Sequence, residues 1–138
     1  MTYQHKVQYY ETDRMGITHH SNYIRFMEEA RGEWMASMGM SYDTFEALGL
    51  SSPVLSVQCE YKHPTTYNDI IDIDIYLLKL SRLKLHVGYK MTCRGTLVCT
   101  GESSHCFLDS GGRPVSLQRS YPDVYAAYER YQSAQGEF

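Results

Sequence analysis

The sequence contains no apolar run close to the length needed to cross a bilayer. A membrane-spanning helix needs about 20 consecutive apolar residues, and no apolar segment follows the opening MTYQHKVQYYETD, so we also expect no signal peptide. Hydrophobic residues make up 43% and charged residues 21%, as in an ordinary globular protein. These observations predict a cytoplasmic protein without membrane insertion.

Cysteine pairs and an excess of basic residues are also missing. The four cysteines form no C-x-x-C motif, and we interpret them as small buried hydrophobes in a reducing compartment. The pair His19-His20 is too weak a signal for zinc, so we predict no metal site. A net charge of −3 and a pI near 6.0 argue against nucleic-acid binding, which usually needs a concentrated basic surface.

A long amphipathic helix is the clearest element that the sequence does contain. Between Asn22 and Met38 the apolar residues recur within a stripe roughly 120° wide. Ser21 or Asn22 is suited to cap its start, and Gly39 to end it. A candidate strand, His5–Tyr10, and a polar loop precede this helix.

The rest of the chain predicts strands, with one short and one terminal helix. Ser41–Leu48 is a candidate short helix, and four segments with alternating apolar residues follow, near 55–61, 71–77, 85–93 and 97–108. We interpret Gly101 as a bulge in the last of them. The final helix is expected to have Ser120 as its cap and Pro122 in its first turn.

This order of elements predicts an α+β protein. Four long antiparallel strands in series can bury one face against a single long helix. The simplest packing wraps the sheet around the helix 22–38, which is the hot-dog fold. With 138 residues, we expect a single domain over residues 1–138.

The loop before the long helix carries the candidate chemistry. It places Asp13, Gly16, His19 and His20 directly before a helix N-terminus. The first N–H groups of a helix lack partners and carry about half a positive charge. They can hold the oxyanion of acyl transfer, while a carboxylate attacks the carbonyl or activates water. A purely structural role remains the alternative, because Asp and His are common in capping loops.

The same segment resembles the signature of the 4-hydroxybenzoyl-CoA thioesterase family. The run from Tyr10 to Tyr23, YETDRMGITHHSNY, is similar to the family pattern Y-x-D-T-D-x-x-G, and the following F-x-E-x-A-R pattern is matched from Phe26 to Arg31. Members of this family include the acyl-CoA thioesterases associated with the Tol-Pal system. A looser similarity continues beyond the helix, beginning at Tyr61-x-x-Pro64.

The sequence departs from the family pattern at three positions. Glu11 stands in place of Asp, and Asn68 and Leu80 stand in place of frequent glycines.

The resemblance implies both a fold and an activity. The fold is a five-stranded antiparallel sheet wrapped around a long central helix, plus a C-terminal helix, and the activity is hydrolysis of acyl-CoA. The catalytic carboxylate falls on Asp13, and the backbone N–H that polarises the thioester carbonyl falls on His20. Gly16 corresponds to the glycine that turns the loop beside the substrate.

The resemblance further implies how substrate and partner copies bind. The residues expected to line the acyl channel are Tyr9, Tyr10, Tyr23, Met27 and Trp34, although core packing would also explain Met27 and Trp34. Arg82 and Lys84 lie in a hairpin that meets the phosphates of coenzyme A. The substrate is an acyl-CoA or an acyl carrier protein thioester, and no separate cofactor is needed because coenzyme A is part of the substrate. The active site is expected at the interface of a homodimer or homotetramer. The apolar alternation of Val54–Tyr61, without protective lysines, independently predicts an edge strand that pairs across a two-fold axis.

Several alternatives remain open at this point. Other hot-dog proteins are enoyl-thioester hydratases, and a non-catalytic acyl-CoA-binding or sensing module is a third candidate. Another hot-dog branch uses a carboxylate on the helix, which makes Glu28 the second candidate, although an ion pair with Arg25 or Arg31 would also explain it. We interpret His63 as structural or as lining the rim of the site.

Overall fold

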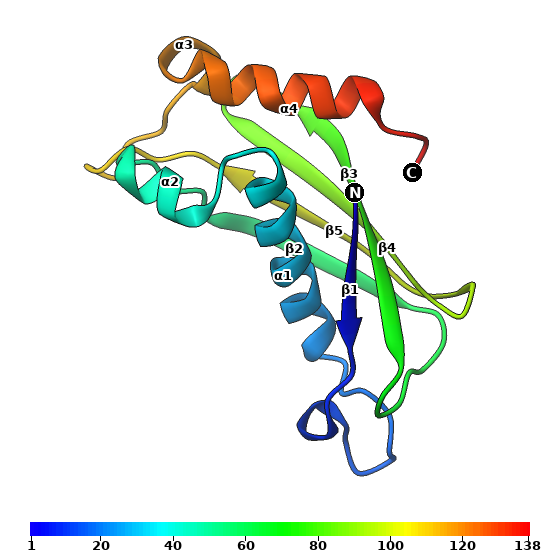
Figure 1. The fold of residues 1–138 in the computed structure, drawn as a ribbon. Coiled ribbons are helices and arrows are strands. Elements are labelled where there is room, and N and C mark those ends of the chain that lie inside the picture. The colour runs from blue at the N-terminus through cyan, green and yellow to red at the C-terminus, as the bar shows by residue number, and fades with distance from the viewer.

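The computed structural model describes residues 1–138 and contains one five-stranded antiparallel sheet with helices packed against it (Figure 1). The strands are β1 Thr2–Lys6, β2 Val54–Tyr61, β3 Ile70–Leu80, β4 Lys84–Cys93 and β5 Thr96–Cys106. The helices are α1 Asn22–Ser37, α2 Tyr42–Ala47, α3 Leu117–Ser120 and α4 Pro122–Ala134, and a 3₁₀ turn, η1, spans Tyr9–Glu11. The strand order is β1-β3-β4-β5-β2. The predicted α+β hot-dog fold is confirmed.

Helix α1 lies across one face of the sheet and buries its apolar stripe there. Phe26, Ala30 and Trp34 are fully buried against the inward side chains of β3, β4 and β5. At Gly101 in β5 the helix leaves little room for a side chain, because a Cβ atom there would lie 3.0 Å from the sulfur of Met27. The prediction of a bulge at Gly101 is wrong, because this residue keeps regular pairing with both neighbouring strands. The absent side chain instead makes room for α1.

The first strand begins and ends earlier than predicted. The sequence suggested a strand over 5–10, whereas β1 spans Thr2–Lys6. The chain then turns because the N–H of Gln8 donates to the carboxylate of Glu11 at 2.8 Å, which closes the η1 turn. The two tyrosines that follow Gln8 are therefore exposed and do not continue the strand.

The start of α1 has an unexpected cap. The helix begins at Asn22 as predicted, but the side chain of Ser21 accepts no hydrogen bond from it. The N–H of Ser21 donates to Nδ1 of His19 at 3.2 Å instead. The side-chain amide of Asn22 donates to the carbonyl of Glu11 at 2.9 Å, so neither predicted residue acts as an acceptor cap.

The C-terminal helical region begins before the predicted residue. Ser120 is the last residue of α3, whose start is capped by Ser116, so the prediction of Ser120 as a cap is wrong. Pro122 does occupy the first turn of α4, as expected. None of the helices combines the length and apolar character of a membrane-spanning segment.

Helix α4 covers an edge of β3. Strand β1 pairs with β3 only as far as Asp74. Beyond it, the side-chain amide of Gln135 both accepts from the N–H of Leu77 at 2.7 Å and donates to its carbonyl at 2.8 Å. The hydroxyl of Tyr131 donates to the carbonyl of Ile75 at 2.7 Å. Side chains of the C-terminal region thus replace a neighbouring strand.

Strand β2 forms the opposite edge of the sheet, as the sequence predicted. It pairs with β5 on one side only. Val54, Leu55 and Val57 are about half exposed along it. A row of exposed apolar side chains on an unpaired edge favours association with another strand.

Candidate functional site

The loop before α1, the end of β2 and the segment after it surround a cavity of about 370 Å³. Three of the residues singled out from the sequence, Asp13, His20 and Tyr23, lie in its lining. The remaining lining residues are Met15, Ile17, Thr18, Tyr61, Lys62, His63 and Pro64. His63 was expected at a rim, and it does line this cavity. The cavity contains no group of three His, Cys, Asp or Glu side chains suited to a metal.

The loop orients the carboxylate of Asp13. Its backbone N–H donates to the carbonyl of Ile17 at 2.8 Å, and its carbonyl accepts from the N–H of Gly16 at 3.0 Å. One carboxylate oxygen, Oδ1, accepts from the N–H of Met15 at 2.8 Å, and the other has no hydrogen-bond partner in the chain. Gly16 has φ +80°, and a Cβ atom at this residue would meet no atom within 4 Å, so the backbone conformation and not the space selects glycine.

The backbone N–H of His20 has no acceptor within the chain. The N–H groups on either side of it are both used, since His19 donates to the carbonyl of Glu11 at 2.8 Å and Ser21 donates to the ring of His19. The carbonyl of His20 accepts from the hydroxyl of Tyr61 at 3.0 Å. A free donor therefore stands directly before the N-terminus of α1, where a developing negative charge is stabilised.

A second set of contacts fixes the part of the loop around Thr18, which precedes α1. The N–H of Thr18 donates to the carbonyl of Thr65 at 2.8 Å, and their hydroxyls lie 2.6 Å apart. The hydroxyl of Tyr23 lies 2.8 Å from the hydroxyl of Thr65. Burial raises the pKa of Tyr23, so the phenol stays neutral. Tyr23 therefore contributes an aromatic wall and not a titrating group, with the Tyr61 ring 5.4 Å away.

The structure does not bring Arg82 and Lys84 to this cavity. Both belong to the β3–β4 hairpin, at the end of β3 that lies away from the loop. The 11 residues of β3 separate the two ends by roughly 33 Å. Within one chain, the hairpin predicted to meet coenzyme A is thus distant from Asp13.

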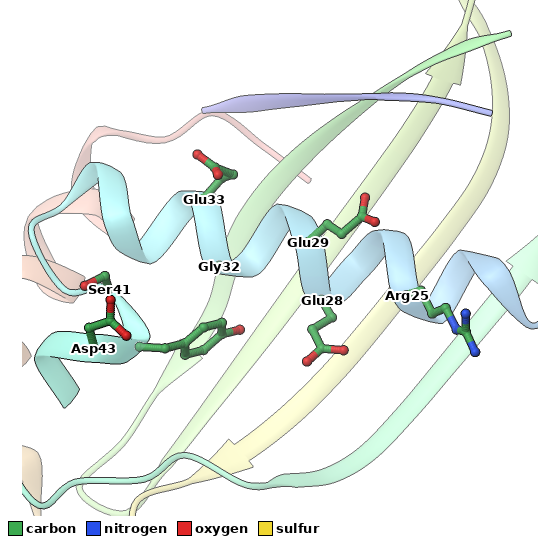
Figure 2. Close-up of a pocket in the computed structure, with 8 residues that line it drawn as sticks. Arg25, Glu28, Glu29, Gly32, Glu33, Ser41 and Asp43 are labelled. Carbon is green, nitrogen blue, oxygen red and sulfur yellow. The ribbon is translucent and has the colours of Figure 1, made fainter. Parts of the chain in front are cut away.

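Glu28, the second candidate carboxylate, lies outside the cavity of Asp13. It borders a separate hollow of about 470 Å³ between α1 and α2 (Figure 2). Glu28 is exposed, and Figure 2 shows its side chain on the same side of α1 as that of Arg25. The predicted ion pair with Arg25 or Arg31 is wrong, because neither pair comes within 4 Å. Arg31 donates instead to the hydroxyl of Tyr89 at 3.0 Å.

Sequence reasoning missed two residues outside the loop that form hydrogen bonds to residues lining the cavity. Tyr61 entered it only as part of the looser similarity, and Thr65 not at all. Both act through hydrogen bonds to residues more than 40 positions away in the chain. A local spacing pattern carries no signal for such contacts, although the similarity at Tyr61-x-x-Pro64 marked the right segment.

Comparison with known proteins places this chain in a family of thioesterases. The family model described as "Thioesterase-like superfamily" matches residues 7–128. A protein of Aquifex aeolicus named "Putative esterase" is 39% identical over 88% of this chain and 94% of its own length. A Bacillus subtilis protein named "Putative acyl-CoA thioesterase" is 32% identical over 91% of this chain and 92% of its own. The solved structure of a DHNA-CoA thioesterase from Staphylococcus aureus has a TM-score of 0.90 at 30% identity, covering 96% of this chain and 90% of that one.

Proposed function

The chain belongs to the thioesterase-like superfamily and is an enzyme of the thioester-hydrolase type, and from this premise we propose that it hydrolyses acyl-CoA with Asp13 as the catalytic carboxylate. One observation supports the assignment of catalytic roles to Asp13 and His20. The carboxylate of Asp13, with one oxygen free of hydrogen bonds, and the unpaired N–H of His20 belong to residues that line the same cavity.

The proposed reaction uses these two groups on opposite sides of one carbonyl. The thioester oxygen accepts from the N–H of His20, which stabilises the negative charge of the tetrahedral intermediate. The free oxygen of Asp13 either attacks the carbonyl carbon or removes a proton from the attacking water. When water attacks, collapse of the intermediate breaks the C–S bond, and the proton that Asp13 removed from water passes to the thiolate of coenzyme A. When Asp13 attacks, C–S cleavage leaves a mixed anhydride on Asp13, and water then hydrolyses this anhydride, supplying a hydroxyl to the acid and a proton to the thiolate.

The substrate proposal follows from the walls of the cavity. Tyr23 and Tyr61 present aromatic rings beside the loop, which suits an apolar or aromatic acyl group. The phosphates of coenzyme A would contact Arg82 and Lys84 only if the hairpin of one copy approaches the cavity of another. The proposed active site is therefore shared within a homodimer or homotetramer.

The test is thiol release from a panel of aliphatic and aromatic acyl-CoA thioesters. We expect release from at least one member, and Asp13→Asn should lower turnover at least about a hundredfold while substrate binding survives. Glu28→Gln is the matched control, because it neutralises a carboxylate outside the cavity, and it should keep wild-type turnover. If Glu28→Gln abolishes turnover and Asp13→Asn retains it, the catalytic carboxylate is on the helix.

The same panel separates the other two candidate functions. A hydratase would consume 2-enoyl-CoA without releasing thiol, which the loss of the enoyl absorbance detects. A binding or sensing module would bind acyl-CoA and release nothing. Either result would contradict the proposed hydrolysis.

A further inference from the structure

A buried histidine outside the cavity joins three elements. His5 of β1 is 9% exposed, and its ring stacks on Phe26 of α1 with the centroids 4.0 Å apart. Its Nε2 lies 2.8 Å from Oε1 of Glu11, and its Nδ1 lies 2.8 Å from Oε2 of Glu29. Glu11 is buried and Glu29 is partly exposed. The three side chains thus connect β1, η1 and α1.

Both ring nitrogens of His5 are engaged by carboxylates. The imidazole has only these two polar atoms, and each lies within hydrogen-bond distance of a different glutamate. His5 is therefore held from both sides. Tyr3 is the remaining titratable group in contact, and its hydroxyl donates to Glu29 at 3.1 Å. Burial and the charge of Glu29 raise the pKa of Tyr3 to about 12, so it stays a neutral donor.

Glu11 connects this charged group to the loop of Asp13. Its carbonyl accepts from the N–H of His19 at 2.8 Å and from the side-chain amide of Asn22 at 2.9 Å. Asp13 follows two residues later, with no regular element between them. The position of Glu11 therefore determines where the loop 11–20 begins and how its first residues, including Asp13, are directed. His5 fixes Glu11 through the 2.8 Å contact between its Nε2 and Oε1 of Glu11, and both residues are buried.

We propose that His5 is a positioning residue for Asp13: by bridging Glu11 and Glu29, it holds the start of the loop 11–20 on helix α1 and thereby sets the carboxylate of Asp13 in the cavity. This inference rests on the proposed function. His5 does not line the cavity, so it acts through Asp13 and touches no substrate.

The experiment combines His5→Gln with Asp13→Asn in a double-mutant cycle. Glutamine has a single donor nitrogen, and its other polar atom is an oxygen that only accepts, so it cannot donate to both carboxylates at once. For the best substrate of the thioester panel, His5→Gln should lower kcat at least tenfold and change KM less than twofold, because a misplaced group costs rate more than binding. In the Asp13→Asn background the same change should cost less than twofold, because the positioned group is gone.

Two further variants keep the result interpretable. Gln4→Ala removes the 2.8 Å hydrogen bond to Asp72 on the same strand and should leave kcat unchanged. Glu29→Gln removes only the partly exposed partner and should lower kcat at least threefold, again only when Asp13 is present. It provides the measurement if His5→Gln does not fold. A kcat within twofold of wild type in the folded variants, or equal losses with and without Asp13, overturns the proposal.

Hydrogen exchange separates failure of this inference from failure of the proposed function. Amides of the loop 11–20 should exchange at least tenfold faster in His5→Gln, while those of α4 keep their wild-type rates. If the wild type releases no thiol from any thioester, the proposed function fails, and faster loop exchange still supports the structural part of this inference. Unchanged loop exchange overturns the inference whatever the activity.

Discussion

His20 contributes a backbone N–H and a side chain to the cavity, and their effects are separable. The imidazole is exposed and stacks on His19, with the ring centroids 4.2 Å apart. His20→Ala keeps the N–H and should slow hydrolysis clearly, yet less than Asp13→Asn does. His20→Pro removes the donor itself and should cost a further factor of about 10² to 10³ in kcat.

The comparison of the two His20 variants requires that both remain folded. Circular dichroism and light scattering should give wild-type secondary structure and mass for each. The measurement is kcat for thiol release by these two proteins under identical conditions. Equal rates for folded His20→Ala and His20→Pro would mean that this N–H does not hold the oxyanion.

Three single residues that depart from the family pattern have local explanations in the structure. Asn68 has φ 70°, a left-handed conformation that asparagine tolerates better than most residues in place of glycine. Glu11 reaches the ring of His5. Leu80 packs partly buried against the core at the end of β3. Each explanation depends on contacts or backbone angles that the sequence pattern alone does not contain.

At the level of elements, the spacing of apolar residues predicted those helices and strands that bury one face along their whole length. Helix α1 was expected over 22–38 and spans Asn22–Ser37, because one stripe of it is buried along its whole length. The ends of elements were predicted less well. The first strand was displaced by the η1 turn, and Ser21 and Ser120 are not caps, because the side chains of Glu11, His19 and Ser116 accept the backbone hydrogen bonds at these boundaries.

Helix α1 is joined to β4 and β5 by a buried chain of polar groups. Arg31 donates to the hydroxyl of Tyr89, which lies 2.7 Å from the hydroxyl of Ser103, and that hydroxyl lies 2.8 Å from Nε2 of His105. Burial first, and then the charges of Arg31 and His86, lower the pKa of His105 to about 3. The folded protein therefore holds His105 neutral, in hydrogen-bond contact with Ser103.

This lowered pKa predicts acid sensitivity. In the unfolded chain a histidine titrates near pH 6.5. Between about pH 6.5 and pH 3 the unfolded state binds more protons than the folded state, so the free energy of unfolding falls as the pH falls, by up to about 1.4 kcal/mol per pH unit. Urea unfolding of wild type and His105→Gln at pH 7, 6 and 5 measures this. The variant should show a shallower pH dependence, and parallel curves would contradict the prediction.

For the whole molecule, the open edge at β2 predicts association of two copies. We expect light scattering at micromolar concentration to give at least twice the chain mass of 16.0 kDa. Val57→Lys places a charge in the middle of β2 and should yield monomers with reduced hydrolysis. Leu48→Lys, an exposed apolar residue outside β2, is the control and should keep the wild-type mass. A wild-type monomer under these conditions would contradict both the pairing and the shared active site.

The hydrogen bonds of Gln135 and Tyr131 to β3 also limit how far such association can proceed. They occupy main-chain groups that an incoming strand would need, and β1, the strand on that side, is only five residues long and ends in Lys6. Fibrils grow only when both edges of a sheet accept a neighbour. With one edge of this sheet obstructed, concentrated protein should form closed particles of fixed size and no filaments.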